Sequence, residues 1–575
     1  MLHTSIPDGF FSTNLLAIDT ETTCRDISKH ADPHSDRTLL ISLCNGRESI
    51  VLEPDESWLP QLWAAIKDED ILTIGQNFSF DLQMLWALGF TGIPAKIWDT
   101  MLAEQVLLGG LSGAFNLAAI AFRRCDISME KDTRATFLAH RGEFTENQLH
   151  YSRKDAEVLV PILHSQYAEC QAKGLLHTAE LENAALPAVA RMEYEGMGFD
   201  TSVWEDTLKQ ERITAQKLER DVQLALQIPS YQIDLLSGAV HGINLNSHQQ
   251  VLRALNKLGI NVEKTDANTL KMYLAKKPDT KVLRQLMEYR HVVKCMGYDY
   301  PKYINLYTNR IHTSFMQIRA QTGRFSSSKP NLQNIPHTPL YRRCFVARDG
   351  WLMVRSDAGQ QEMRILAELS GDQNLLDVCR TTDVHLEIGK RMYHDPDMQK
   401  DDPRRYLAKN CGFAMSYGAK PKRVALMADI SLDDAKQIVD FVVSEFPVAM
   451  TWGERQIAQA NDLGYVSTIG GRRRNFQRAN EDEYIDNQAR NAPVQGTAAD
   501  VMKRALWQIY LRLLEGEYQA VPVMTIHDEV IVEAPENEAD AVANIVVNEM
   551  RKAGEYYVKT VPMPADVTIA SCWQK

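Results

Sequence analysis

The first 175 residues alternate short apolar runs with longer stretches in which hydrophobic residues recur at helical spacing. The short runs have the length and the Leu and Ile content of buried strands. They are residues 15–18, 39–43 and 71–74. Helical stretches, such as 80–88 and 156–170, alternate with them. This alternation predicts an α/β domain over residues 1–175.

The pattern changes near residue 180. Residues 180–300 are rich in Leu, Lys, Glu and Gln at helical spacing and carry few strand signals, which predicts a hairpin of long helices. Strand-like runs return at 311–319 and 344–357, and residues 372–512 are again mostly helical. The second part of the chain is therefore expected to combine a small sheet with two helical regions.

Length and composition bound the class of protein. A chain of 575 residues is too long for one hydrophobic core and predicts about three or four domains. Its nine cysteines are scattered without a Cys-x-x-Cys pair, so we expect neither a zinc site nor disulfides, and a reduced, cytoplasmic compartment. The sequence has no apolar run of 18 residues and no signal-peptide pattern at its N-terminus, so no membrane association is expected.

The net charge of −12 argues superficially against a nucleic-acid partner. Local clusters of basic residues nevertheless make a phosphate-binding surface, whatever the net charge is. Three clusters lie beside the candidate catalytic segments described below, and this position favours phosphate binding over a solvated face. They are Arg319, Arg324, Lys329, Arg342 and Arg343; Arg404, Arg405, Lys409, Lys420, Lys422 and Arg423; and Arg472, Arg473, Arg474 and Arg478.

Polar residues in the N-terminal domain form three closely spaced pairs. They are Asp19 and Glu21, Asn77 and Asp81, and Tyr151 and Asp155. Residues i and i+2 share one face of a strand, and residues i and i+4 share one face of a helix. Four converging carboxylates repel one another unless divalent cations lie between them. The set therefore predicts a metal site suited to phosphodiester hydrolysis, although any single pair is more often a surface carboxylate or a helix cap.

These pairs resemble the Asp-x-Glu, Asn-x-x-x-Asp and Tyr-x-x-x-Asp motifs of the DEDDy proofreading 3′→5′ exonucleases. The resemblance implies an RNase H-like α/β fold for residues 1–175, with Asp19, Glu21, Asp81 and Asp155 as metal ligands. It also implies that Tyr151 orients the attacking water. Taken alone, the same domain could belong to an RNA-trimming nuclease.

Two further carboxylates lie far apart in the sequence. Asp357 is the last residue of the strand-like segment 344–357. Asp528 lies between the apolar runs 521–526 and 530–533. The latter pattern predicts a β-hairpin whose turn presents Asp528 and Glu529. Joining a nucleotide to a chain end needs shared carboxylates that hold two divalent cations, together with fixed cations that hold the triphosphate.

A basic and aromatic stripe lies between these carboxylates. Arg405, Lys409, Phe413 and Tyr417 recur every four residues, which predicts one face of a helix. Its cationic end could hold a triphosphate and its aromatic end could stack on a base pair. An aromatic stripe is more often plain core, but two basic residues on it disfavour that interpretation.

The second part of the chain resembles family A DNA polymerases. The motifs are Thr322-Gly323-Arg324 with residues 330–336, Asp357 to Arg364, Arg405 to Gly418, Gly464 to Arg473, residues 491–500, and His527-Asp528-Glu529. The resemblance implies a right-hand polymerase domain over 176–575, with the thumb at about 190–310, the palm at about 311–371 and 497–575, and the fingers at about 372–496. With the first domain, it implies a proofreading, template-directed DNA polymerase of phage or organellar type that acts in replication.

The resemblance also assigns roles to individual residues. It implies that Asp357, Asp528 and Glu529 are catalytic, that the carbonyl of Ala358 is a metal ligand, and that Glu362 excludes the 2′-hydroxyl of a ribonucleotide. The implied nucleotide contacts are Arg405, Lys409, Phe413, Tyr417, Glu362, Gln360 and His385. The implied DNA contacts are Arg324, Asn331, Gln333, Asn334, Asn491, Gln495, His527, Arg472 and Arg473.

The implied cofactors are two Mg²⁺ ions at each site, with Mn²⁺ as a substitute. The implied partners are primer–template DNA and dNTPs, with a replicative helicase or a single-strand binding protein as further candidates. We expect a monomer in a host cytoplasm, or in an organelle matrix after removal of a transit peptide. Too few residues precede residue 15 for a 5′-nuclease domain, so we expect none.

Two departures from the family pattern affect these assignments. Ala358 replaces the Tyr that usually follows the first catalytic Asp, and Asn487 replaces a frequent Arg, which leaves the template contact there open. Two other functions compete with a DNA polymerase. One is a nuclease whose C-terminal half only grips DNA, which the intact Asp357 and Asp528 disfavour. The other is a single-subunit RNA polymerase, which Glu362 and the nuclease motifs disfavour.

Overall fold

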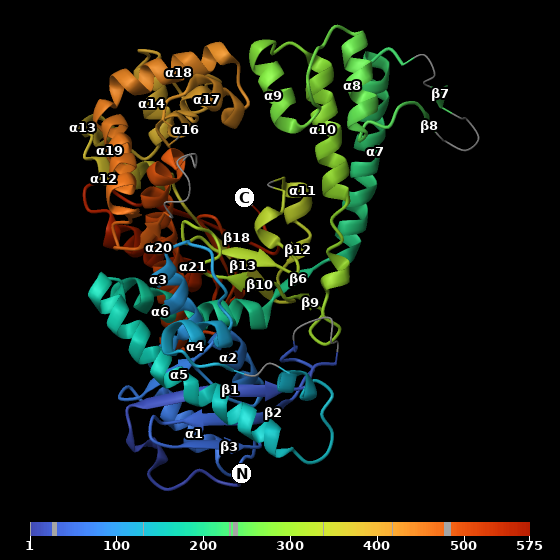
Figure 1. Ribbon diagram of the computed structural model, residues 1–575. Coiled ribbons are helices and arrows are strands. Elements are labelled where there is room, and N and C mark those ends of the chain that lie inside the picture. Colours follow the sequence, from blue (N-terminus) through green and yellow to red (C-terminus); the bar gives the residue numbers. More distant parts are fainter. Residues whose placement is uncertain are drawn as a thin grey trace.

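The N-terminal domain is built on a five-stranded mixed sheet with the order β3-β2-β1-β4-β5 (Figure 1). The computed structural model describes residues 2–25, 31–129, 132–228, 232–233, 240–336, 338–416, 418–476 and 485–574. The strands are β1 (Leu15–Thr22), β2 (Thr38–Cys44), β3 (Ser49–Leu52), β4 (Leu72–Gly75) and β5 (Ile97–Asp99). β1 pairs antiparallel with β2 and parallel with β4. The three predicted strands are confirmed, whereas β3 and β5 were not predicted.

Helices cover both faces of this sheet. They are α1 (Leu59–Lys67), α2 (Phe78–Ala87), α3 (Thr100–Leu108), α4 (Leu117–Cys125) and α5 (Glu146–Lys173). Leu16 and Ile18 of β1 pack in one core with α1 and α2, and Ala17, between them, packs in a second core with α3 and α5. The alternation of side chains along a strand explains the two cores. The fold class predicted for residues 1–175 is confirmed.

A long helix, α6 (Leu176–Glu195), connects the N-terminal domain to the rest of the chain. It follows α5 after the left-handed Gly174, which ends that helix. Leu186 and Ala190 of α6 belong to the core of the N-terminal domain, while Ala188 and Val189 belong to the core of the next domain. α6 therefore joins the two domains by packing into both.

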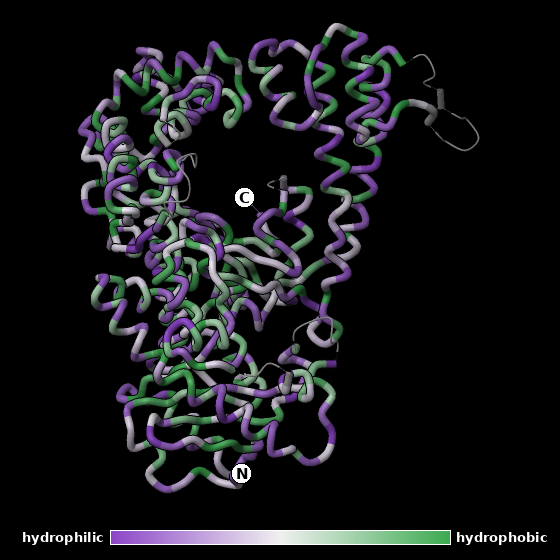
Figure 2. The backbone as a smooth tube through the Cα atoms, viewed as in Figure 1, coloured by the Kyte–Doolittle hydropathy of each residue, from purple (hydrophilic) through white to green (hydrophobic). Residues whose placement is uncertain are grey.

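The long-helix hairpin predicted for residues 180–300 is present as α7 (Thr201–Ala225) and α10 (Lys281–Met296), which pack together. α8 (His248–Lys257) and α9 (Ala267–Lys276) complete this thumb region, beside the short strands β7 (Gln232–Ile233) and β8 (Val240–His241). Hydrophilic and hydrophobic segments alternate along α7 and α10 (Figure 2). Among the described residues, no helix combines the length and the apolar character needed to cross a bilayer.

The palm is a four-stranded antiparallel sheet with the order β16-β17-β13-β18. Its strands are β13 (Trp351–Ala358), β16 (Val521–Ile526), β17 (Glu529–Pro535) and β18 (Ala565–Ala570). The predicted hairpin near the C-terminus is confirmed as β16 and β17, whereas β18 was not predicted. Two long helices, α20 (Asp486–Glu515) and α21 (Ala539–Tyr557), share the core of this sheet.

Short elements surround the palm. A three-stranded sheet joins β6 (Met197–Phe199), β9 (Arg310–Ile311) and β12 (Phe345–Val346), and β10 (Ser314–Met316) pairs with β11 (Ser326–Ser328). The remaining short elements are α11 (Pro339–Arg342), η1 (Phe10–Ser12), η2 (Asp132–Thr136), η3 (Pro301–Tyr303) and η4 (Leu332–Asn334).

The fingers are helical and stand opposite the thumb, with the palm sheet between their bases (Figure 1). Their helices are α12 (Gln361–Ser370), α13 (Gln373–Cys379), α14 (Val384–Met392), α15 (Arg405–Ala408), α16 (Cys411–Ser416), α17 (Pro421–Ala428), α18 (Leu432–Glu445) and α19 (Pro447–Leu463). A hairpin of β14 (Tyr465–Ser467) and β15 (Arg473–Asn475) follows. The prediction of one helix through 405–417 is wrong, because a turn at residues 409–410 separates α15 from α16.

Two candidate active sites

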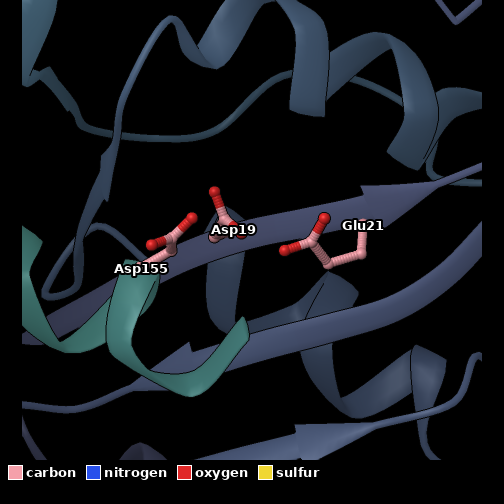
Figure 3. A group of neighbouring side chains, drawn as sticks. All are labelled: Asp19, Glu21 and Asp155. Carbon is pink, nitrogen blue, oxygen red and sulfur yellow. The ribbon is translucent and has the colours of Figure 1, made fainter. Parts of the chain in front are cut away.

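Three carboxylates of the N-terminal domain converge beside β1 (Figure 3). Asp19 and Glu21 come from β1 and Asp155 comes from α5, and one oxygen of each lies within 4.8 Å of the others. Glu21 Oε1 and Asp155 Oδ1 are buried and have no hydrogen-bond partner. Buried acceptors without donors are costly, and carboxylate oxygens are the ligands that Mg²⁺ prefers. The group therefore fits a divalent cation.

The electrostatics of this group lead to the same conclusion. Burial, followed by repulsion from Asp155, raises the pKa of both Asp19 and Glu21 well above the usual range. Burial raises the pKa of Asp155 to about 6. The fully ionised group is thus unstable on its own, and a bound cation would restore the ordinary ionisation.

Helix capping fixes the position of Asp155 and of its neighbour Tyr151. Thr145 and Gln148 form a capping box at the start of α5, and the left-handed Gly174 ends the helix. Tyr151 and Asp155 share a hydrogen bond, which, with burial as the largest cause, raises the pKa of the tyrosine well above its ordinary value. Tyr151 therefore stays protonated and can donate a hydrogen bond.

Asp81 lies outside the group of three. It is buried, and its Oδ1 accepts hydrogen bonds from the amide (3.0 Å) and the hydroxyl (2.6 Å) of Thr20. Burial raises its pKa to about 7. Its role as a metal ligand stays a prediction. The sequence did not single out Asp99, a buried carboxylate that accepts from the amides of Phe78 (2.6 Å) and Leu102 (2.9 Å) and so anchors the starts of α2 and α3.

A second set of carboxylates lies at one end of the palm sheet. Asp357 lies near the end of β13 directly opposite Glu529, the first residue of β17. Asp528 lies in the turn before β17, and its carbonyl accepts a hydrogen bond from the amide of Ala358 (3.0 Å). The Asp357 side chain is 23% exposed, so it is accessible from solvent. Two carboxylates beside a strand end suit a hard divalent cation.

Glu529 has a different environment. Its side chain is 4% exposed and pairs with Arg342 (3.2 Å) and Arg355 (2.6 Å). Burial opposes ionisation, but hydrogen bonds and charge from Arg355 and then Arg342 dominate and lower the pKa of Glu529. Two arginines already pair with the carboxylate of Glu529, and its predicted catalytic role stays a prediction. Arg355 was not predicted, although its position two residues before Asp357 places both on one face of the strand.

Three of the predicted nucleotide contacts, Gln360, His385 and Arg405, lie near the starts of α12, α14 and α15. Arg405 pairs with Asp383 (2.7 Å), which caps α14 through the amide of Leu386 (3.0 Å). Burial lowers the pKa of His385 to about 4, so this imidazole is neutral at pH 7. Gln360 accepts a hydrogen bond from the amide of Val384 (3.2 Å). These contacts connect the start of α12 to α14.

Glu362 forms an ion pair with Arg324, so both residues have a partner within the protein. The family resemblance implies instead that Glu362 contacts an incoming sugar and that Arg324 contacts DNA. Lys409 lies in the turn between α15 and α16. Tyr417 and the side chain of Phe413 lie outside the described residues, and so does Arg478.

The predicted DNA contacts differ in exposure. Asn331, Asn334 and His527 are exposed, Gln333, Gln495 and Arg473 are half-buried, and Asn491 is buried. Gln333 donates to the carbonyl of Thr525 (2.6 Å), and Arg473 donates to the carbonyl of Lys173 (2.7 Å). With the oxygen and nitrogen of its side-chain amide exchanged, Asn487 accepts a hydrogen bond from Arg423 (2.5 Å).

The position of Arg472 does not support the predicted contact with DNA. It is buried, its Nε pairs with Asp500 (2.7 Å), and its Nη2 pairs with Glu182 of α6. A guanidinium held by two carboxylates in the interior is not available for a phosphate. Its placement argues against a DNA contact and for a role in joining α6 to the palm.

Comparisons with known proteins agree with this arrangement. Residues 213–575 match the family model described as DNA polymerase family A, and residues 11–166 match that described as 3′-5′ exonuclease. The thermostable DNA polymerase I of Thermus aquaticus is 33% identical over an alignment covering 68% of this chain and 48% of that protein. DNA polymerase I of Pseudomonas aeruginosa is 28% identical over 98% of this chain and 63% of that protein.

The fold also has a counterpart among solved structures. The POL domain of Pol1 from M. smegmatis, in complex with DNA primer–template and dNTP, superposes with a TM-score of 0.81 at 21% identity and covers 99% of both chains. This chain spans about half the length of the Thermus relatives that it matches. By the extent of the family match and the identity to these relatives, the chain belongs to DNA polymerase family A and carries a 3′–5′ exonuclease domain before its polymerase domain.

Proposed function

We propose that this chain is a template-directed DNA polymerase that extends a primer at the palm site and removes mispaired 3′ ends at the N-terminal site. One observation carries the proposal. The chain holds two separate carboxylate sites, Asp357 with Asp528 on the palm and Asp19, Glu21 and Asp155 on the N-terminal sheet. Each has the ligand chemistry for phosphoryl transfer by divalent cations.

At the palm, Asp357, Asp528 and the carbonyl of Ala358 would hold the cations. When bound, two Mg²⁺ ions, or Mn²⁺ in their place, would activate the primer 3′ oxygen and neutralise the triphosphate. Arg405 and Lys409 would bind the phosphates. Because Arg405 pairs with Asp383 in this structure, a triphosphate must compete with that carboxylate for the guanidinium.

At the N-terminal site, Asp19, Glu21 and Asp155 would hold the cations that hydrolysis needs, again two in number. The pKa of Tyr151 is raised, so its hydroxyl keeps its proton and orients a water rather than acting as a base. This site would degrade DNA from its 3′ end.

Substrates and partners follow from the same proposal. Primer–template DNA and dNTPs are supported by the ligands of the M. smegmatis Pol1 domain, whose fold this chain shares. We also propose the division into exonuclease, thumb, palm and fingers at the boundaries that the sequence predicts, and a role in replication. A helicase or single-strand binding partner, a monomeric state and a cytoplasmic location stay predictions.

A labelled primer–template in Mg²⁺ tests the proposal. With dNTPs we expect extension to the end of the template, and without dNTPs we expect shortening from the 3′ end, faster for a mispaired than for a paired terminus. EDTA should stop both reactions. Shortening without any extension under these conditions would favour a nuclease that only grips DNA.

A further inference from the structure

A buried arginine, Arg355, pairs with two of the palm carboxylates. Arg355 is 6% exposed and lies two residues before Asp357 on β13, so the two side chains share a face of the sheet. Its Nη2 donates to Asp357 Oδ2 (2.7 Å) and to Glu529 Oε1 (2.6 Å). One guanidinium nitrogen thus joins a predicted metal ligand to a buried carboxylate.

A second arginine holds the same buried carboxylate from another side. Arg342 is 1% exposed, pairs with Glu529 and lies over the ring of Trp573 at 4.4 Å. Three carboxylates, Asp357, Asp528 and Glu529, therefore face two fixed guanidinium groups. Their summed charge is −1, whereas three carboxylates alone would carry −3.

The N-terminal site is built differently. Glu21 Oε1 and Asp155 Oδ1 are buried without a hydrogen-bond partner. No ion pair to Asp19, Glu21 or Asp155 is found among the residues that the structure describes. The charge of Arg134 acts on these three carboxylates without an ion pair to them, whereas Arg355 donates directly to Asp357 at the palm.

We propose that Arg355 is an internal counter-ion that weakens cation binding at the palm carboxylates until a nucleoside triphosphate arrives, and that it holds Asp357 in one orientation. Both effects follow from its contacts. A positive charge within hydrogen-bond distance of a ligand repels an approaching cation strongly in a partly buried site. A hydrogen bond to Oδ2 restricts the orientation of the Asp357 carboxylate.

A bound triphosphate changes the charge that cations meet at the palm site. It brings several negative charges, so cations that Arg355 repels from the free protein become favourable when they bind with the nucleotide. The palm site would then load its cations together with dNTP, whereas the N-terminal site would load them in the free protein. This inference rests on the proposed polymerase function and concerns how the same site acquires its metal.

Binding of Mn²⁺, followed by electron paramagnetic resonance, measures this effect without relying on activity. The Asp19→Ala, Glu21→Ala protein removes the N-terminal site, and adding Asp357→Ala identifies the signal from the palm. In this background we expect Arg355→Met and Arg355→Gln to tighten nucleotide-free Mn²⁺ binding by about tenfold or more. Arg355→Lys keeps the charge and should bind as the parent does.

Saturating dNTP should reduce the difference between Arg355→Met and the parent. A matched control is Arg310→Met, which removes another buried arginine of the palm region from its carboxylate, Glu533 (2.6 Å). The guanidinium of Arg310 donates to Glu533 and to the carbonyls of Glu195 and Gly196, away from the palm carboxylates, so Mn²⁺ binding should not change.

Three results would overturn the inference. In the first, Arg355→Met and Arg355→Gln bind Mn²⁺ no more tightly than the parent. In the second, Arg310→Met gains as much Mn²⁺ affinity as they do. In the third, Arg355→Met and Arg355→Gln both fail to fold while Arg355→Lys folds. The last result would assign Arg355 to stability alone. If Asp357→Ala removed no Mn²⁺ binding even with dNTP, the proposed polymerase site itself would be wrong, which is a distinguishable outcome.

Discussion

Glu182 gives the sharpest prediction for stability. It is fully buried on α6 and pairs with Lys503, which is also fully buried on α20, and with Arg472 beside β15. Asp500 is the other carboxylate of this cluster, so two acidic and two basic groups balance. Replacing Glu182 with Ala leaves an uncompensated positive charge in the interior.

The expected loss is large. Removing one partner of a buried ion pair costs about 3–5 kcal/mol of unfolding free energy. For a cooperative unit of 150–250 residues this corresponds to a lower melting temperature by roughly 6–20 °C. The matched control is Glu180→Ala on the same helix, because Glu180 is exposed. A surface change of this kind should alter the free energy by less than about 0.5 kcal/mol.

The pH dependence adds an independent check. Burial already lowers the pKa of Lys503 to about 8, and Glu182 is the largest influence that opposes this shift. Without Glu182 the folded-state pKa of Lys503 falls further below 8, so in the folded variant this lysine loses its proton at a lower pH than in the parent. The unfolded lysine keeps its proton up to about pH 10, so stability rises with pH above the folded-state pKa; for the parent this rise begins at about pH 8, and for the variant it begins at a lower pH.

If the folded-state pKa of Lys503 falls by about one unit, the difference in unfolding free energy between variant and parent should narrow by about 1.4 kcal/mol between pH 7 and pH 9. Calorimetry at the two pH values, with the transition that contains α6 and α20 assigned by fluorescence, measures both quantities. If Glu182→Ala melted at the same temperature as Glu180→Ala, or if the difference in unfolding free energy between variant and parent widened with pH, our account of this cluster would be refuted.

The remaining predictions concern the two active sites. Asp357→Ala should reduce primer extension at least a hundredfold, about 2.7 kcal/mol of transition-state stabilisation, and leave single-strand degradation intact; residual extension above that level would contradict the assignment. Asp19→Ala with Glu21→Ala should abolish 3′ degradation and leave extension near normal, and persistent shortening would place the nuclease elsewhere. Glu362→Ala should admit ribonucleotides and lower overall efficiency, which competition between rNTP and dNTP measures; unchanged discrimination would show that this carboxylate does not face the sugar.

The sequence predicted the strands and helices whose patterns are long and regular. The runs at 15–18, 39–43 and 71–74 became β1, β2 and β4, and the hairpin around Asp528 became β16 and β17. β5 was missed because three residues are too few to show alternation, and β3 was not singled out although it is as long as the predicted β4. The single helix expected through 405–417 failed because spacing alone does not reveal the turn at 409–410.

The site was predicted unevenly for a related reason. Asp19, Glu21 and Asp155 could be grouped because strand and helix spacing fix which side chains share a face, and one long helix brings Asp155 to the strand. Asp99 and Arg355 were missed, since each has one partner, Phe78 and Glu529 respectively, in an element distant in sequence.

The basic clusters show where the limit of such reasoning lies. Arg324, Arg342 and Arg472 all lie beside catalytic motifs, and all three pair with carboxylates of this chain. Arg342 and Arg472 are also buried, because the carboxylates opposite them compensate the cost of removing a guanidinium from water. A phosphate can recruit such an arginine only by displacing that partner. Arg324, whose side chain is 35% exposed, can exchange Glu362 for DNA, whereas Arg472 cannot leave Glu182 and Asp500 without exposing the interior.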